Sequence, residues 1–195
     1  GGGSLSVYTD ATPTGCGGWV HIPATNTVFF FCLPYPPSLA RVVIQPGKID
    51  IGESFTMLVA AQTFVDGLLA RTAVTFHVDN DGICESTGKE KANRLEVNEI
   101  LKAFYTLVTY KDMHFRVVHI PRAYNSAADT LSRLKVEEFR YLHSLGRCYQ
   151  LNPLLAGETA LLSAGSRFCL PFSPNPATKA MQSSGSPHLG LNTLS

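Results

Sequence analysis

The sequence predicts an α/β fold in which helices pack on a mixed sheet of five strands. Three short β-prone stretches follow one another before residue 34, and after residue 52 segments of helical period alternate with short apolar runs. A leading meander followed by alternating β and α units is typical of a mixed sheet covered by helices. The 195 residues, 45% of them hydrophobic, suffice for one domain with a buried core.

The first strands are predicted from runs of β-branched and aromatic residues over 5–9, 17–22 and 27–33. The third run is apolar enough for a strand packed on both faces. Only a short turn at 24–26 separates the second run from the third, so we expect an antiparallel hairpin there. A proline-rich loop follows, and residues 41–44 are a weaker candidate for an extended segment.

The second half of the domain shows apolar residues three and four positions apart, as on one face of a helix. Helices are predicted over 52–70, 93–110 and 126–145. Apolar runs at 73–78 and 115–120 lie between them and predict buried strands, the second of which is ended by Pro121.

The two ends of the chain differ in composition from its middle. Residues 1–4 (Gly-Gly-Gly-Ser) look like a linker or a cloning remnant. From residue 151 onward Ser, Gly and Pro are abundant and charged residues are few. Such a composition disfavours a packed core. We therefore expect one folded domain over 5–150 and a flexible tail over 151–195.

Charge and cysteine content narrow the classes of function. The net charge of +1 gives no global basic signature, so nucleic-acid binding would depend on a local patch or on metal ions. The five cysteines are scattered and form no CxxC pair, which favours free thiols in a reducing compartment over a zinc knuckle or a disulfide framework. No apolar run is long enough for a membrane span and no signal-peptide pattern is present, so we expect an intracellular protein of the cytoplasm or nucleus.

Four acidic residues stand at the ends of predicted elements. Asp10 follows the first strand and Asp79 follows the strand at 73–78, so the two lie side by side if these strands are neighbours. Glu53 opens the first helix and Asp129 lies in the first turn of the last one. Four carboxylates at close range repel one another, and divalent cations relieve this conflict. Hard oxygen ligands suit Mg²⁺, for which Mn²⁺ can substitute, and two such ions can hydrolyse a phosphodiester.

Glu53 has a competitor in Asp50. We favour Glu53 because its position fits the phase of the helix, whereas Asp50 precedes Gly52 and is expected to lie outside the helix.

The residues that flank Asp10, Asp79 and Asp129 indicate a protein family more specifically than the acids themselves do. The segments are Val7-Tyr8-Thr9-Asp10-Ala11 before a glycine-rich turn, His77-Val78-Asp79-Asn80, and His119-Ile120-Pro121 followed by Asn125 and Ala128-Asp129. Together they resemble the ribonuclease H domains that follow reverse transcriptases in retroelements, above all DIRS-like retrotransposons. The hepadnavirus polymerase is a near second, because "DATPTG" and the closing pattern N-x-A-A-D-x-x-S-R are similar there. The resemblance covers roughly residues 5–135.

This resemblance implies a ribonuclease H-like fold and a two-metal-ion endonuclease that cleaves the RNA strand of RNA–DNA hybrids during reverse transcription. It also implies an adjoining reverse transcriptase domain as partner. The residues that match the metal-binding carboxylates are Asp10, Glu53, Asp79 and Asp129. His119 matches a histidine thought to assist proton transfer or product release, and Asn80 and Asn125 match polar positions near the substrate backbone.

Substrate contacts are expected from the turn after the first strand and from scattered basic residues. A protein can distinguish RNA from DNA by the 2′-hydroxyls in the wide minor groove. The turn residues placed to do so are Ala11, Thr12, Thr14 and Gly15. Candidate phosphate ligands are Lys89, Lys91, Arg94, Arg122 and Arg133. Acidic residues interrupt this set, so we expect weak hybrid binding by the isolated domain, with further affinity from the adjoining polymerase domain.

Two alternatives stay open. Transposases or resolvase-type nucleases of the same superfamily share the carboxylate chemistry. A non-catalytic ribonuclease H-like scaffold is the rival from another class, although degenerate copies typically lose one or more acids and all four are present here.

Overall fold

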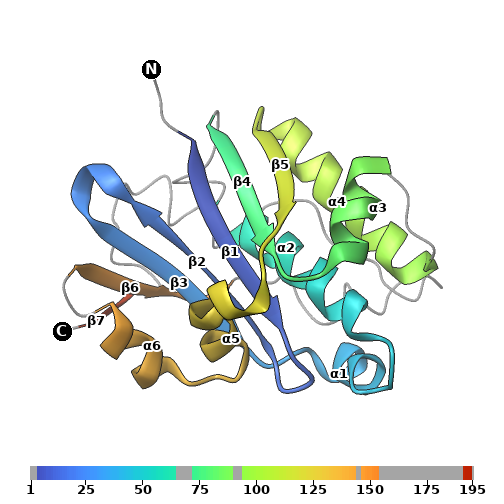
Figure 1. Ribbon diagram of the computed structural model, residues 1–195, viewed down its shortest axis with the longest axis horizontal. Coiled ribbons are helices and arrows are strands. Elements are labelled where there is room, and N and C mark those ends of the chain that lie inside the picture. The colour runs from blue at the N-terminus through green and yellow to red at the C-terminus, as the bar shows by residue number, and fades with distance from the viewer. Residues whose placement is uncertain (1–3, 65–71, 90–93, 144–145, 154–190, 195) are drawn as a thin grey trace.

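A seven-stranded mixed sheet with strand order β5-β4-β1-β2-β3-β6-β7 forms the centre of the protein (Figure 1). This computed structural model describes residues 4–64, 72–89, 94–143, 146–153 and 191–194. The strands are β1 (Leu5–Ala11), β2 (Cys16–Ile22), β3 (Thr27–Leu33), β4 (Ala73–Val78), β5 (His114–His119), β6 (Arg147–Leu151) and β7 (Leu191–Leu194). The helices are α1 (Pro37–Val43), α2 (Ile49–Phe64), α3 (Asp81–Lys89), α4 (Leu95–Tyr110), α5 (Ser126–Ser132) and α6 (Val136–Leu142), with short 3₁₀ turns η1 (Pro23–Thr25) and η3 (Arg122–Tyr124).

The pairing of the strands confirms the predicted meander and the predicted mixed sheet. β1 pairs with β2 and β2 with β3, in both cases antiparallel. β4 then lies parallel to β1 on its other side, and β5 lies parallel to β4. Because β1 and β4 run in the same direction, the residues that follow them meet at one edge of the sheet.

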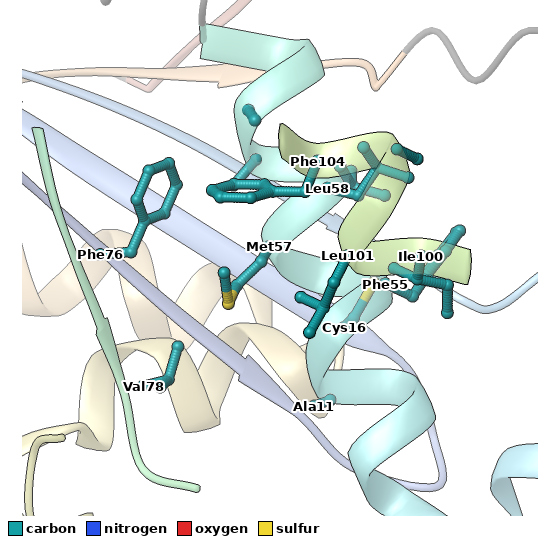
Figure 2. Packing of buried hydrophobic residues seen from close by; sticks show 14 of the residues in the cluster. Ala11, Cys16, Phe55, Met57, Leu58, Phe76, Val78, Ile100, Leu101 and Phe104 are labelled. Atoms are coloured by element: carbon teal, nitrogen blue, oxygen red, sulfur yellow. The ribbon is translucent and has the colours of Figure 1, made fainter. Parts of the chain in front are cut away.

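Helices cover both faces of the sheet (Figure 1). Phe31 belongs to the large buried cluster formed with α2 and α4, in which Phe76, Met57 and Phe104 also pack (Figure 2). Its neighbour Phe30 points to the opposite face and belongs to a second buried cluster with residues of α5 and α6. Successive side chains of a strand point to opposite faces, so β3 is packed on both sides, as its uninterrupted apolar run predicts.

Two predicted elements were wrong in kind or number. Residues 41–44, expected to be extended, fall mainly within helix α1, whose first position is Pro37, where the missing N–H of proline costs nothing. The single helix expected over 126–145 is two helices, because Leu134 adopts a left-handed conformation (φ 62°) between α5 and α6.

Three observed elements were not predicted. Helix α3 begins at Asp81, in the polar segment that follows the predicted strand at 73–78. The Asn80 side-chain carbonyl caps it by accepting a hydrogen bond from the Ile83 amide (3.0 Å). Strand β6 adds to the sheet parallel to β3, and β7 adds antiparallel to β6. These last two strands raise the count from the expected five to seven.

The ends of several predicted segments lie outside the described residues. α2 begins at Ile49 and is described as far as Phe64, so its expected continuation to residue 70 is not covered. Residues 1–3 and most of the expected tail, 154–190, also lie outside them. Among the described residues, no helix is long and apolar enough to cross a membrane.

Candidate active site

Three of the predicted carboxylates meet at the edge of the sheet where β1 and β4 end. Tyr8 pairs with His77 in the parallel register of β1 and β4. Asp10 and Asp79 each come two residues later, Asp10 within β1 and Asp79 directly after β4. Glu53 comes from α2, which packs against β1. Carboxylate oxygens from these three residues all lie within 4.8 Å of one another. Asp10 and Glu53 are both buried, each with 3% of its surface exposed.

Asp50, the competitor of Glu53, has a different role. It lies in the first turn of α2 and not outside the helix as expected, because α2 begins one residue before it. Its Oδ1 accepts a hydrogen bond from the Ile51 amide, and its Oδ2 pairs with Arg94 Nε at 3.0 Å. Asp50 therefore ties the start of α2 to the start of α4, and Glu53 is the residue that points to the other acids.

Asp129 reaches the cluster because α5 lies directly on the sheet. Gly17 pairs with Asp10 in the β1–β2 register. A Cβ at Gly17 would overlap the Cβ of Leu131 and lie 2.9 Å from the Leu131 carbonyl carbon, so the helix can approach this closely only over a glycine. Asp129 stands beside Asp10, close enough to help raise the pKa of that carboxyl, but outside the group of three acids whose oxygens lie within 4.8 Å of one another.

Two buried hydrogen bonds fasten α5 to β1. The side-chain amide of Asn125 donates a hydrogen bond to the Thr9 carbonyl at 3.0 Å. The Thr12 hydroxyl donates one to the Ser132 carbonyl, also at 3.0 Å. Asn125 and Thr12 are 2% and 8% exposed. Both side chains thus position the helix that carries Asp129, and their expected contacts with substrate stay predictions.

Burial and mutual repulsion favour the protonated form of the two most buried acids. Burial raises the pKa of Asp10 to about 7, with further contributions from the charge of Asp79 and a hydrogen bond with Asp129. Burial also raises the pKa of Glu53 well above its usual value, and the charges of Asp10 and Asp79 raise it further. The cluster therefore retains protons near neutral pH when no cation is present.

The same cluster fits a divalent cation. Its donors are carboxylate oxygens, which Mg²⁺ and Mn²⁺ prefer. Glu53 Oε2 is buried and makes no hydrogen bond within the described part of the chain. A buried acceptor without a donor costs free energy that a cation would recover. Asp10, Glu53 and Asp79 could hold the cation directly, with Asp129 next to them.

Asp129 differs from the buried acids in its surroundings. Partial burial acts to raise its pKa, but hydrogen bonds with Arg133 and Asp10 and the charges of Arg133 and Arg122 outweigh burial, so the pKa is lowered. Arg133 Nε lies 3.1 Å from Asp129 Oδ2. Asp129 therefore keeps its negative charge more readily than Asp10 or Glu53.

His119 and Asn80 lie at the same sheet edge but contact other groups. His119 ends β5 opposite Val78, and its Nε2 lies 3.5 Å from Asp81 Oδ1. The side chain of His119 is 41% exposed, so it is open to substrate or solvent. Asn80 caps α3 as described above. The auxiliary role of His119 and the substrate role of Asn80 stay predictions.

The β1–β2 turn presents one exposed hydroxyl. Ala11 and Gly15 are buried, and the Thr12 amide donates to the Gly15 carbonyl at 2.9 Å, which closes the turn. The side chain of Thr14 is exposed and its amide donates to the Thr12 hydroxyl. Of the four predicted turn contacts, Thr14 has the side chain most open to a ligand.

The predicted phosphate ligands divide into two groups. Arg94 is engaged by Asp50 and by the Gly47 carbonyl. Arg122 and Arg133 are exposed and both act on Asp129. Lys91 and the side chain of Lys89 lie outside the described residues. The described basic charge near the acids thus comes from Arg122 and Arg133.

Sequence reasoning missed Ser132. Its hydroxyl lies 3.3 Å from Asp10 Oδ2, although the two residues are 122 positions apart. Ser132 stands in the closing pattern N-x-A-A-D-x-x-S-R, but a serine three residues after an acid has no evident role until the helix is docked on β1.

Neither a protein-family profile nor a curated protein sequence matches the chain. Solved structures do resemble it. Ribonuclease H1 of the halophilic archaeon Halobacterium salinarum NRC-1 superposes with a TM-score of 0.52 and 15% identity, over 70% of this chain and 99% of that one. LC11-RNase H1, isolated from compost by metagenomics, gives a TM-score of 0.48 at 16% identity over 69% and 96% of the two chains. Its complex with an RNA/DNA hybrid gives 0.49 at 19% identity over 66% and 93%.

The superposition on the archaeal enzyme covers nearly all of that protein, so the chain has a ribonuclease H fold. This confirms the predicted fold class, and the likeness at 15% identity concerns the fold alone.

Proposed function

We propose that the protein is a metal-dependent endonuclease that cleaves the RNA strand of RNA–DNA hybrids and leaves 5′-phosphate ends. The observation that carries this proposal is the convergence of Asp10, Glu53 and Asp79, whose carboxylate oxygens lie within 4.8 Å of one another on a ribonuclease H fold. Asp129 stands beside them as the fourth acid. Structural acids of a folded domain are usually solvated, whereas these are gathered and largely buried.

Asp10, Glu53 and Asp79 would hold Mg²⁺, with two ions in all and Mn²⁺ as a substitute. Bound divalent ions supply Lewis-acid activation of water and stabilisation of the leaving oxygen. The chain contributes a buried setting in which water competes poorly for the cations, because Asp10 and Glu53 are each 3% exposed. Asp129, with its lowered pKa, contributes negative charge on the exposed side of the cluster.

Other residues of the sheet edge would bind and orient the hybrid. Thr14, whose side chain is exposed, and the backbone of the β1–β2 turn would contact the minor groove with its 2′-hydroxyls. Arg122 and Arg133 offer exposed guanidinium groups to phosphates. His119, 41% exposed, can hold or release a proton at its ring nitrogen during cleavage or product release.

The cellular setting of this activity follows from the segments around the acids. Their similarity to retroelement ribonuclease H domains supports a role in reverse transcription, with an adjoining reverse transcriptase domain as partner and DIRS-like retrotransposons as the source. Such an enzyme works in the cytoplasm or nucleus.

A cleavage assay tests the proposal. The chain is incubated with labelled RNA–DNA hybrid, duplex RNA and duplex DNA in Mg²⁺, Mn²⁺ or EDTA, beside Asp79→Asn. The matched control is Asp112→Asn, because Asp112 is exposed and its left-handed backbone (φ 52°) suits asparagine equally well. We expect cutting of the hybrid's RNA strand alone, lost in EDTA and in Asp79→Asn and retained in Asp112→Asn.

The other outcomes identify the alternatives. Cutting of duplex DNA would favour a transposase or resolvase-type nuclease of the same superfamily. Absence of cutting in every lane, by a chain whose circular dichroism shows it folded, would favour the scaffold.

A further inference from the structure

Ser132 is the last residue of α5 and has no exposed surface. Its hydroxyl Oγ lies 2.6 Å from the carbonyl oxygen of Asp129 and 3.3 Å from the carboxylate Oδ2 of Asp10. A hydroxyl has one hydrogen to donate. Ser132 can therefore donate either to its own helix or to the acid on β1.

The backbone of Ser132 is also tied to β1. Its carbonyl accepts the hydrogen bond from the Thr12 hydroxyl at 3.0 Å, immediately after the strand ends at Ala11. The hydroxyl and the backbone carbonyl of Ser132 thus both contact the segment that carries Asp10. Fully buried polar groups whose bonds are satisfied hold their partners in one arrangement.

Thr130 shows that the contact with Asp10 is not a general property of the helix. A serine or threonine hydroxyl bonded to a carbonyl three or four residues back is common in helices. Thr130 Oγ1 makes such a bond to the Ser126 carbonyl at 2.9 Å on an exposed side of α5, without reaching a carboxylate. Ser132 makes the same kind of bond and in addition reaches Asp10.

We propose that Ser132 is a positioning residue that orients the Asp10 carboxylate for divalent-cation binding and holds Asp10 in register with Asp129. A carboxylate has about four acceptor directions. A hydrogen bond from Ser132 to Oδ2 restricts the rotation of this group and leaves the remaining directions for a cation. Groups that hydrogen-bond to metal ligands in this way set the orientation of the ligand. The inference rests on the proposed function in so far as it takes the acids to bind a divalent cation.

The test compares Ser132→Ala with Thr130→Ala in the full chain. Each variant loses one hydroxyl and one helix back-bond, and only Ser132→Ala loses the contact with Asp10. Mn²⁺ binding is measured by calorimetry, and hybrid cleavage is measured as a function of Mg²⁺. We expect Ser132→Ala to weaken Mn²⁺ binding and raise the half-saturating Mg²⁺ about 10- to 100-fold, with the KM for the hybrid unchanged. Thr130→Ala is expected to match the wild type.

Equal Mn²⁺ affinity in Ser132→Ala and Thr130→Ala would overturn the inference. If Ser132→Ala fails to fold, Ser132→Cys takes its place, because cysteine keeps the size of the side chain and only a weak donor. A wild-type Mn²⁺ affinity together with a wild-type Mg²⁺ dependence in Ser132→Cys would then overturn the inference in the same way. A wild-type chain that binds Mn²⁺ more tightly than Ser132→Ala but does not cut the hybrid would support the positioning role while refuting the nuclease. A chain that cuts the hybrid equally well with and without the hydroxyl would refute the positioning role alone. Failure of the wild type in both binding and cutting would refute both.

Discussion

At the scale of single residues, the site holds two buried acids, Asp10 and Glu53. Burial raises the pKa of both, and the negative charge of Asp79 raises both further. Asp10 and Glu53 favour their neutral forms in the cation-free protein. A raised pKa in the folded state means that the folded protein binds the proton more tightly than the unfolded chain does, so the protonated acid stabilises the fold. The contribution of Asp10 to stability is therefore fully present below about pH 4, the range of an unfolded aspartate, and is lost as the pH rises through about 7.

The first prediction concerns this pH dependence. In EDTA, the free energy of unfolding of the wild type should fall between pH 5 and pH 8, by on the order of a few kcal/mol, because one pKa unit corresponds to about 1.4 kcal/mol. Asp10→Asn carries no ionisable group at that position and should show a flatter profile and a higher stability than the wild type at pH 8. Urea unfolding at both pH values measures the difference. Parallel profiles for the two proteins would contradict the raised pKa of Asp10.

The second prediction concerns Arg133, which is half exposed and pairs with Asp129 on the same helix. Exposed ion pairs on one helix contribute little to stability, so Arg133→Ala should leave the melting temperature nearly unchanged. Loss of a phosphate ligand should raise the KM for the hybrid several-fold and reduce the slope of log affinity against log salt by about one.

The matched control for Arg133 is Arg140→Ala. Arg140 forms a similar helical ion pair with Glu137 on α6. A KM that rises equally in both variants would assign the effect to total charge and not to the position of Arg133.

At the scale of elements, the docking of α5 on β2 decides whether the fourth acid joins the other three. The third prediction is that Gly17→Ala destabilises the protein by about 1–3 kcal/mol, the usual cost of forcing an extra carbon into a packed contact. The added methyl would push against Leu131 and shift α5 away from Asp10, so metal-dependent cleavage should fall more than stability does.

Gly82→Ala is the control for Gly17→Ala. Gly82 lies in the first turn of α3, is exposed, and is crowded only by the Asn80 side chain. Chemical denaturation and cleavage rates of both variants give the comparison. Full activity in Gly17→Ala would show that α5 tolerates displacement.

The elements that sequence patterns predicted well are those with long periodic or apolar runs. β3, β4 and α4 show such patterns, and they were placed within two residues of their observed bounds. The missed elements lack them. α3 begins in Asp-Gly, a typical turn pair, and its first turn depends on the cap from Asn80. The break at Leu134 depends on a left-handed residue that no local preference of leucine predicts.

The residues of the site likewise divide into those that the sequence predicted and those that it did not. Asp10, Asp79 and Glu53 could be chosen from the sequence because each lies near the end of a predicted strand or the start of a predicted helix, and the structure brings them together. The contacts of Thr12 and Ser132 could not, because they join segments 120 positions apart and exist only after α5 has docked. Sequence spacing carries no information on such contacts until the packing is known.

At the scale of the whole molecule, the net positive charge is too small to attract a polyanion strongly. The chain carries a net charge of +1, and the described basic residues near the acids are Arg122 and Arg133. The fourth prediction is that the isolated chain binds RNA–DNA hybrid weakly, with a dissociation constant of about micromolar or above at physiological salt, falling steeply in affinity as salt rises. A fluorescence-anisotropy titration in Ca²⁺ or EDTA at several salt concentrations measures this. Nanomolar binding at physiological salt would refute it.

The strand order also determines when the acid cluster can assemble during synthesis. β1 is made before the other strands of the sheet. Its parallel neighbour β4, whose residues Val74 to His77 pair with Leu5 to Tyr8, is made later, and α5 follows later still. Contacts between distant segments form slowly, because long loops must close before the contacts stabilise them. A growing chain can therefore fold its β1–β3 meander while Asp10 still lacks Asp79 and Asp129. The four acids can therefore come together only when nearly the whole domain has been made.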